Sequence, residues 1–137
     1  MNRGALYKKG VDTVLNMDVL KIKAEIYVSE YLQHYGIQPN LRGYFFLRTA
    51  VLMYIEDDTV LTRIRTGLYP EIAEKYRTTP QRVESSMRNA IESAWKNRIS
   101  GNKLNDIRGS NEKPSNTEFI SSATEKVMGE LRNASKK

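Results

Sequence analysis

Residues 69–97 have the sequence YPEIAEKYRTTPQRVESSMRNAIESAWKN, which predicts a short helix, a tight turn and a longer helix. Pro70 suits the first position of a helix, and Thr79 followed by Pro80 is a typical start for the second one. The apolar residues of the second helix recur with helical spacing and share one face. They are Val83, Met87, Ala90, Ile91, Ala94 and Trp95. The small residue Ala73 in the first helix would let the two helices approach closely.

The opposite face of the second helix carries polar side chains, most of them long, in its first three turns. They are Gln81, Arg82, Ser85, Arg88, Asn89 and Glu92. A helix-turn-helix protein touches base edges with this part of its second helix, while the first helix braces the unit against the DNA backbone. The alternative is an ordinary helical hairpin with a solvated polar face, and periodicity alone does not separate the two.

Length and composition limit the class of protein. A chain of 137 residues has room for one domain with a hydrophobic core and some tail. The net charge of +6 favours an anionic partner, nucleic acid before a membrane surface. Much of the excess lies around the predicted helix pair, because the stretch from Arg63 to Arg108 holds ten basic and five acidic residues.

Several other classes of protein are disfavoured. The absence of cysteine excludes a disulfide framework and cysteine-based metal sites. No apolar run approaches the ~20 residues that a membrane span needs, and no signal peptide is recognisable. We therefore expect a cytoplasmic, nucleoid-associated protein that has no contact with membranes.

The sequence predicts an all-α fold, a compact bundle of about six helices. Residues 1–16 are expected to be a flexible basic arm, residues 17–132 the helical domain and residues 133–137 a disordered tail. The first helix is predicted from Asp18 to Tyr35, closed by Gly36. Its core stripe is expected to contain Ile22, Ile26 and Leu32, with Val19 and Ser29 in register.

The remaining helices follow from apolar patterns and capping residues. Residues 41–55 are apolar nearly all round, which is typical of a buried central helix, with Asn40 as its cap. A short helix is expected over residues 59–65, capped by Asp57 or Asp58 and ended by Thr66-Gly67. Residues 99–115 read as a loop. The sequence from Ser115 to Glu118 is a capping box that opens a last helix. The core positions of this helix are Phe119, Ala123, Val127 and Leu131.

The chain offers little catalytic chemistry. His34 is the only histidine, and nothing near it in sequence completes a catalytic constellation. The adjacent acids Asp57 and Asp58 are better explained as a helix start than as a metal site. No phosphate-binding glycine loop is present. We expect no enzymatic activity, no metal and no cofactor.

From Tyr35 to Leu131 the sequence resembles the DNA-binding effector domain of the sporulation-initiation response regulator of endospore-forming bacteria. The matching residues keep their order and approximate spacing over about a hundred positions. They are Gly43-Tyr44, Leu47-Arg48, Ala50, Leu68-Tyr69-Pro70, Ile72-Ala73, Thr78-Thr79, Arg82-Val83-Glu84, Arg88, Ala90-Ile91-Glu92, Ala94-Trp95, Lys113-Pro114, Asn116 and Glu118-Phe119-Ile120.

The resemblance implies a six-helix domain whose reading helix, here Pro80 to Asn97, enters the major groove at a short promoter box. It also implies tandem pairs on double-stranded DNA and contact with RNA polymerase. We expect base reading by Gln81, Arg82, Glu84, Ser85, Arg88 and Asn89, and contacts to the DNA backbone by Lys75, Thr78, Thr79 and Lys96.

Chemistry supports individual roles within this set. Arg82 can donate two hydrogen bonds to guanine, and Glu84 can accept one from cytosine N4. Arg88 lies further along the helix and more plausibly reaches a phosphate. The alternative role of Glu84 is a helix-stabilising pair with Arg88 at i+4.

The sequence departs from the family at three places. The chain begins with only a short arm where the family normally has a phosphoacceptor receiver domain, so we expect either a fragment or a stand-alone protein, without control by phosphorylation within this chain. The family usually has an arginine at the position of Ser85 and an alanine at that of Pro80. The segment between Trp95 and Pro114 is shorter than in the family, which uses this region toward polymerase. Two hypotheses follow: a sequence-specific DNA-binding regulator, and a protein-interaction module that keeps the fold and pairs with a full-length relative.

Overall fold

The computed structural model describes residues 14–98 and 112–135, which form five α-helices and no strand. The helices are α2 (Val14–His34), α3 (Arg42–Glu56), α4 (Tyr69–Lys75), α5 (Pro80–Lys96) and α6 (Asn116–Ser135). A 3₁₀-helix, η1 (Val60–Arg63), and a π-helix, η2 (Ile64–Leu68), lead into α4. The predicted all-α class is confirmed. The predicted number of about six helices is wrong for the described residues, because the segment predicted as a short α-helix over residues 59–65 forms η1 and the start of η2 instead.

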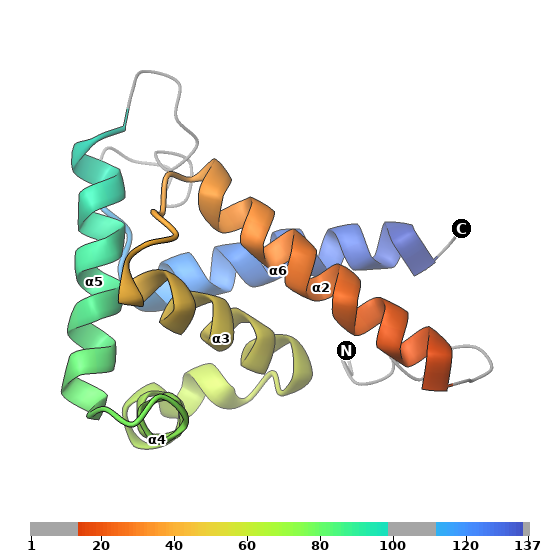
Figure 1. Ribbon diagram of the computed structural model, residues 1–137, viewed down its shortest axis with the longest axis horizontal. Coiled ribbons are helices and arrows are strands. Elements are labelled where there is room, and N and C mark those ends of the chain that lie inside the picture. The colour runs from red at the N-terminus through yellow and green to blue at the C-terminus, as the bar shows by residue number, and fades with distance from the viewer. Residues whose placement is uncertain (1–13, 99–111, 136–137) are drawn as a thin grey trace.

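Helix α3 is the centre of the fold. It contacts α2, α5 and α6, as predicted for a helix that is apolar nearly all round. Figure 1 shows α5 at one end of the molecule, with α4 beside its N-terminal end, while α2 and α6 lie side by side and reach the opposite end. None of the described helices is long and apolar enough to cross a membrane. This arrangement leaves one long side of α5 at the surface.

The predicted core stripe of α2 is only partly correct: Leu32 is buried against α3 and α6, as predicted, but most of the stripe is not. Ile22, Ile26 and Val19 are 57%, 48% and 41% exposed, so their assignment to the core is wrong. The buried side chains of α2 and of the residue after it are Ala24, Val28, Leu32 and Tyr35. The helix carries two apolar stripes, and contact with α3 and α6 buries the one that contains Ala24 and Val28.

The N-terminus of α3 is fitted closely against α5. Its N-cap is Leu41 rather than the predicted Asn40, and no side chain caps this end. A Cβ added at Gly43 would lie 2.2 Å from the backbone oxygen of Ser86, closer than real Cβ atoms approach. Glycine at this position therefore lets the backbones of α3 and α5 touch, which fixes the position of α5.

The segment after α3 is wound differently from the α-helix predicted for residues 59–65. Its N-cap is Thr59, whose backbone N–H and hydroxyl donate to the carboxylate of Asp57 at 3.0 and 2.6 Å. These two hydrogen bonds, followed by the charge of Arg63, hold the pKa of Asp57 below its ordinary value. The predicted stop at Gly67 is also wrong, because η2 continues through Gly67 directly into α4.

The last helix agrees with its prediction. The backbone N–H of Glu118 donates to the Ser115 hydroxyl at 3.1 Å, and the Ser115 N–H donates to the Glu118 carboxylate at 2.9 Å, which confirms the capping box. The four predicted core residues of α6 are all buried.

The predicted domain boundaries can be compared with the structure only where it describes the chain. Residues 1–13 and 99–111 lie outside the described residues, as do residues 136–137. Helix α2 begins at Val14, earlier than the predicted Asp18, and α6 continues to Ser135, into the stretch predicted as a tail. The division into arm, domain and tail stays a prediction.

Candidate nucleic-acid interface

The turn between α4 and α5 spans residues 76–79 and contains no glycine. Thr79 is the N-cap of α5, since its hydroxyl accepts a hydrogen bond from the backbone N–H of Arg82 at 3.2 Å. Pro80 is the first helical residue, so both predictions for this helix start are confirmed. At the other end of the turn, Arg77 has a φ of 55°. The N-terminus of α5 is thus held by local hydrogen bonds as well as by packing.

Helix α5 has a buried side and an exposed side, as its periodicity predicts. The buried residues are Val83, Met87, Ala90, Ile91 and Ala94. Trp95 is only half-buried, and the guanidinium of Arg98 lies 3.5 Å from the centre of its ring. This division confirms which face of α5 belongs to the core.

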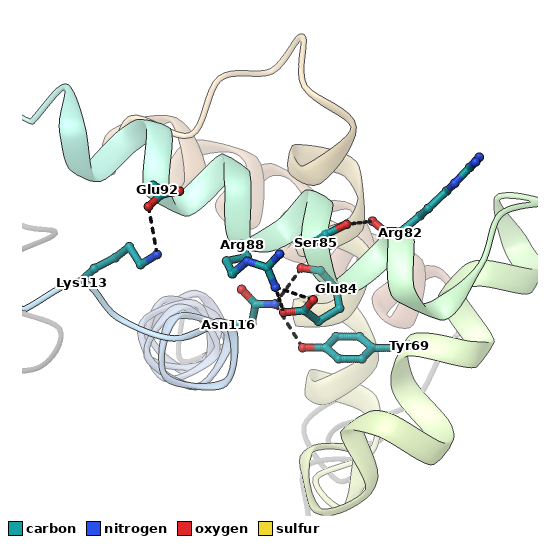
Figure 2. Close-up of polar contacts among 8 residues, drawn as sticks. All are labelled: Tyr69, Arg82, Glu84, Ser85, Arg88, Glu92, Lys113 and Asn116. Carbon is teal, nitrogen blue, oxygen red and sulfur yellow. Dashed lines mark hydrogen bonds and ion pairs between the residues drawn. The ribbon is translucent and has the colours of Figure 1, made fainter.

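None of the six predicted base-reading side chains is buried. Those of Gln81, Arg82, Arg88 and Asn89 are exposed, and those of Glu84 and Ser85 are half-buried. In Figure 2 the side chain of Arg82 extends away from the other labelled residues. Its guanidinium has no hydrogen bond or ion pair with the residues that the structure describes. Arg82 is therefore available to a ligand without breaking an existing contact.

Glu84 and Arg88 bind each other. One guanidinium nitrogen, Nη1 of Arg88, donates to both carboxylate oxygens of Glu84 at 2.6 Å (Figure 2). The i,i+4 pair that the sequence offered as the alternative role of Glu84 is thus present. The hydroxyl of Ser85 donates to the backbone oxygen of Arg82 at 3.4 Å, so this short side chain stays close to the helix.

A groove of about 850 Å³ lies between the first turns of α5 and the start of α6. Three predicted base-reading residues, Gln81, Glu84 and Arg88, line one side of it. The groove also receives Arg65 and Lys113, and the ammonium of Lys113 is 3.5 Å from the carboxylate of Glu92. Cationic side chains outnumber acidic ones along this groove, which suits an anionic ligand.

Asn116 joins the two helices that meet at the groove. Its side-chain Nδ2 donates to the hydroxyl of Tyr69 and to the backbone oxygen of Glu84, both at 3.1 Å (Figure 2). Asn116 is buried, and burial also raises the pKa of Tyr69 above its ordinary value. These hydrogen bonds fix α5 relative to α4 and α6.

The four residues predicted to contact the DNA backbone do not form one group. Lys75 is exposed at the end of α4, and Thr78 and Thr79 follow it in the turn. The Thr79 hydroxyl is occupied by the cap, whereas the buried hydroxyl oxygen of Thr78 has no partner among the described residues. Lys96 is the last residue of α5, roughly 24 Å from the turn at ~1.5 Å per residue over the helix. Three of the four therefore lie in the turn or directly before it.

Other residues at this surface were not assigned from the sequence. Arg65 and Lys113 line the groove, and Arg77 is exposed in the turn. In the sequence, only the family motif with Lys113, Pro114 and Asn116 marked the segment before α6. The spacing of apolar residues could not predict that this segment lies beside α5, because the tertiary fold brings the two together.

Comparison with known proteins assigns the family. Residues 28–127 match the family described as sporulation initiation factor Spo0A C terminal, a range that includes the α4–turn–α5 unit, all of α3 and much of α6. The chain belongs to this family. It is accordingly a DNA-binding effector domain of a sporulation and transcription regulator, and double-stranded DNA is its partner. The resemblance inferred from the sequence is confirmed.

The Spo0A C-terminal family consists of DNA-binding regulator domains rather than enzymes. Within residues 14–98 and 112–135, no group of three or more His, Cys, Asp or Glu side chains is placed to hold a metal ion. The prediction that this chain has no catalytic activity stays a prediction.

Proposed function

We propose that this chain binds a specific double-stranded DNA sequence by inserting the outer side of α5 into the major groove. The single observation that supports this most is Arg82, an exposed arginine in the first turn of α5 that has no partner among the described residues. Helix-turn-helix proteins place this part of the second helix against base edges. An unpaired guanidinium there can bind guanine O6 and N7 together.

In this proposal Glu84 reads a base in addition to pairing with Arg88. To accept a hydrogen bond from cytosine N4, its carboxylate must give up part of its contact with Arg88. An exposed i,i+4 ion pair stabilises a helix by only about 0.3–0.5 kcal/mol, whereas a good base contact discriminates by roughly 1–3 kcal/mol. The pair with Arg88 therefore does not prevent Glu84 from reading a base, and release of Arg88 frees it for a phosphate.

Ser85 is where the base preference of this chain should differ from that of its family. The family usually has an arginine at this position, whose side chain could reach a base. The hydroxyl of Ser85 is directed back to the helix backbone. We expect the base pair opposite this position to be read weakly. A bidentate contact from an arginine discriminates between bases by roughly 1–3 kcal/mol, and Ser85 cannot make that contact.

The test is a fluorescence-anisotropy titration of the chain with a duplex that carries the family's promoter box and with a scrambled duplex, both at ~150 mM salt. Non-specific affinities are typically ~10⁻⁴ to 10⁻⁶ M under such conditions. We expect the box to bind about a hundredfold or more tightly. We also expect affinity to fall steeply with salt, because several cationic contacts release counterions.

Two variants of Arg82 give the test its specificity. Arg82→Ala should remove the preference for the box, and Arg82→Lys should retain charge while losing much of the bidentate discrimination. Lys126→Ala, at an exposed position of α6, serves as the control and should leave the preference unchanged. Equal binding of both duplexes by the unmodified chain would reject sequence-specific reading by α5.

One observation favours the second hypothesis, a module that binds protein. Val19, Ile22 and Ile26 are exposed apolar residues with helical spacing on α2. A tandem partner on DNA, a full-length relative or RNA polymerase could cover such a stripe. Arg82→Ala separates the hypotheses, since it should abolish DNA reading and leave protein binding by α2 intact.

A further inference from the structure

Two helices of this protein end in the same backbone motif. At the end of α2, the N–H of Gly36 donates to the oxygen of Gln33 and the N–H of Ile37 to that of Leu32, both at 3.0 Å. This pair of bonds is the Schellman motif, which requires a left-handed residue just after the helix. Gly36 supplies it with a φ of 84°. Glycine is the usual residue there because it has no Cβ to clash.

Helix α4 ends with the same two hydrogen bonds. The N–H of Arg77 donates to the oxygen of Glu74 at 3.3 Å, and the N–H of Thr78 donates to that of Ala73 at 2.9 Å. The left-handed position is occupied by Arg77, with a φ of 55°, and Arg77 is the only described residue other than glycine with a positive φ. An arginine in this conformation is strained, and only glycine and asparagine adopt it readily.

Contacts within the protein do not explain an arginine at this position. The side chain of Arg77 is exposed, and no hydrogen bond or ion pair joins it to the described part of the chain. The motif itself uses only backbone groups of Arg77, which any residue provides. The Schellman motif holds the left-handed backbone of this residue, and residues held in such conformations cluster at binding sites. The side chain of Arg77 is thus available for a ligand outside the protein.

We propose that Arg77 binds a phosphate of the DNA backbone beside the groove that α5 enters. This inference rests on the proposed function, because the turn that contains Arg77 leads directly into the first turn of α5. Phosphates flank the major groove, and a guanidinium binds them with paired hydrogen bonds. The left-handed backbone fixes the direction in which the side chain leaves the turn. Lys75 and Arg82, both exposed, add positive charge on either side.

The experiment measures stability and DNA binding of the same variants. Arg77→Gly removes both the strain and the charge, and Arg77→Lys keeps both. For Arg77→Gly we expect the midpoint of thermal unfolding to stay the same or rise. We expect its affinity for box and scrambled duplexes to fall alike, by about fivefold at ~150 mM salt, with the slope of log K against log salt reduced by about 0.9. Arg77→Lys should retain the slope of the unmodified chain.

The outcomes separate this inference from the function on which it rests. If the unmodified chain binds DNA and Arg77→Gly binds with the same affinity and salt slope, the phosphate contact is rejected while the proposed function stands. A lower unfolding midpoint for Arg77→Gly would reject the strain argument. A loss confined to the box duplex would mean that Arg77 reads bases rather than phosphate. Failure of the unmodified chain to bind any duplex would reject both proposals.

Discussion

The close contact between α3 and α5 gives the sharpest prediction from this fold. Replacing Gly43 with alanine places a Cβ 2.2 Å from the backbone oxygen of Ser86 and 2.7 Å from the Cβ of Ala90. Ordinary contacts of this kind begin at 3.4 Å, so the two helices must move apart by about 1.2 Å at this point. Neither partner is a flexible side-chain end that could rotate away. The overlap must be relieved by displacement of the backbone.

The expected loss of stability follows from two opposing effects. Overpacking a well-packed core typically costs about 1–3 kcal/mol, and a clash between two helix backbones belongs at the upper end. Alanine has a higher helix propensity than glycine, which offsets at most about 1 kcal/mol. We therefore expect Gly43→Ala to lower the free energy of unfolding by about 2 kcal/mol, although the substitution adds apolar surface.

Urea denaturation followed by circular dichroism measures this change, and the chain provides a matched control. Gly129 lies within α6, and a Cβ added there meets no atom within 4 Å. Gly129→Ala should raise the free energy of unfolding by about 0.5–1 kcal/mol. If Gly43→Ala is also neutral or stabilising, the backbone contact between α3 and α5 does not exist as described.

Three further predictions concern stability. Thr79→Ala should lower the free energy of unfolding by about 1 kcal/mol because it removes the cap of α5, and Thr79→Ser should restore it in urea denaturation. Asn116→Ala should lower the free energy of unfolding by roughly 1–3 kcal/mol in the same assay, because the hydroxyl of buried Tyr69 loses the amide group that donates to it. Burial raises the pKa of Tyr31 above its ordinary value of 10.0, and the folded state therefore disfavours the phenolate. The contribution of neutral Tyr31 to the free energy of unfolding is complete below pH ~10 and is lost above it, because the tyrosine ionises in the unfolded chain. In urea denaturation from pH 8 to 11, Tyr31→Phe should therefore show a smaller fall in the free energy of unfolding than the unmodified chain.

The amino-acid sequence alone was sufficient for those features that depend on neighbouring residues. The caps at Thr79 and Ser115 are set by side chains that bond to backbone groups three residues away, so they can be predicted from a short stretch. The buried face of α5 follows from apolar residues at helical spacing, with few apolar residues elsewhere on that helix. The family resemblance rests on the same local motifs. These features need no knowledge of what packs against them.

The tertiary structure decided the features that depend on distant contacts. Helix α2 has two apolar stripes, and its sequence gives no reason to bury Val28 rather than Ile22, because only α3 and α6 select between them. Residues 60–68 adopt 3₁₀ and π geometry to connect α3 with α4, a requirement set by where both helices lie. Arg77 is an ordinary basic residue in the sequence, and its left-handed backbone follows from the Schellman motif that ends α4. Local pattern thus specified the helix that we propose reads DNA, while long-range packing determined how that helix is held.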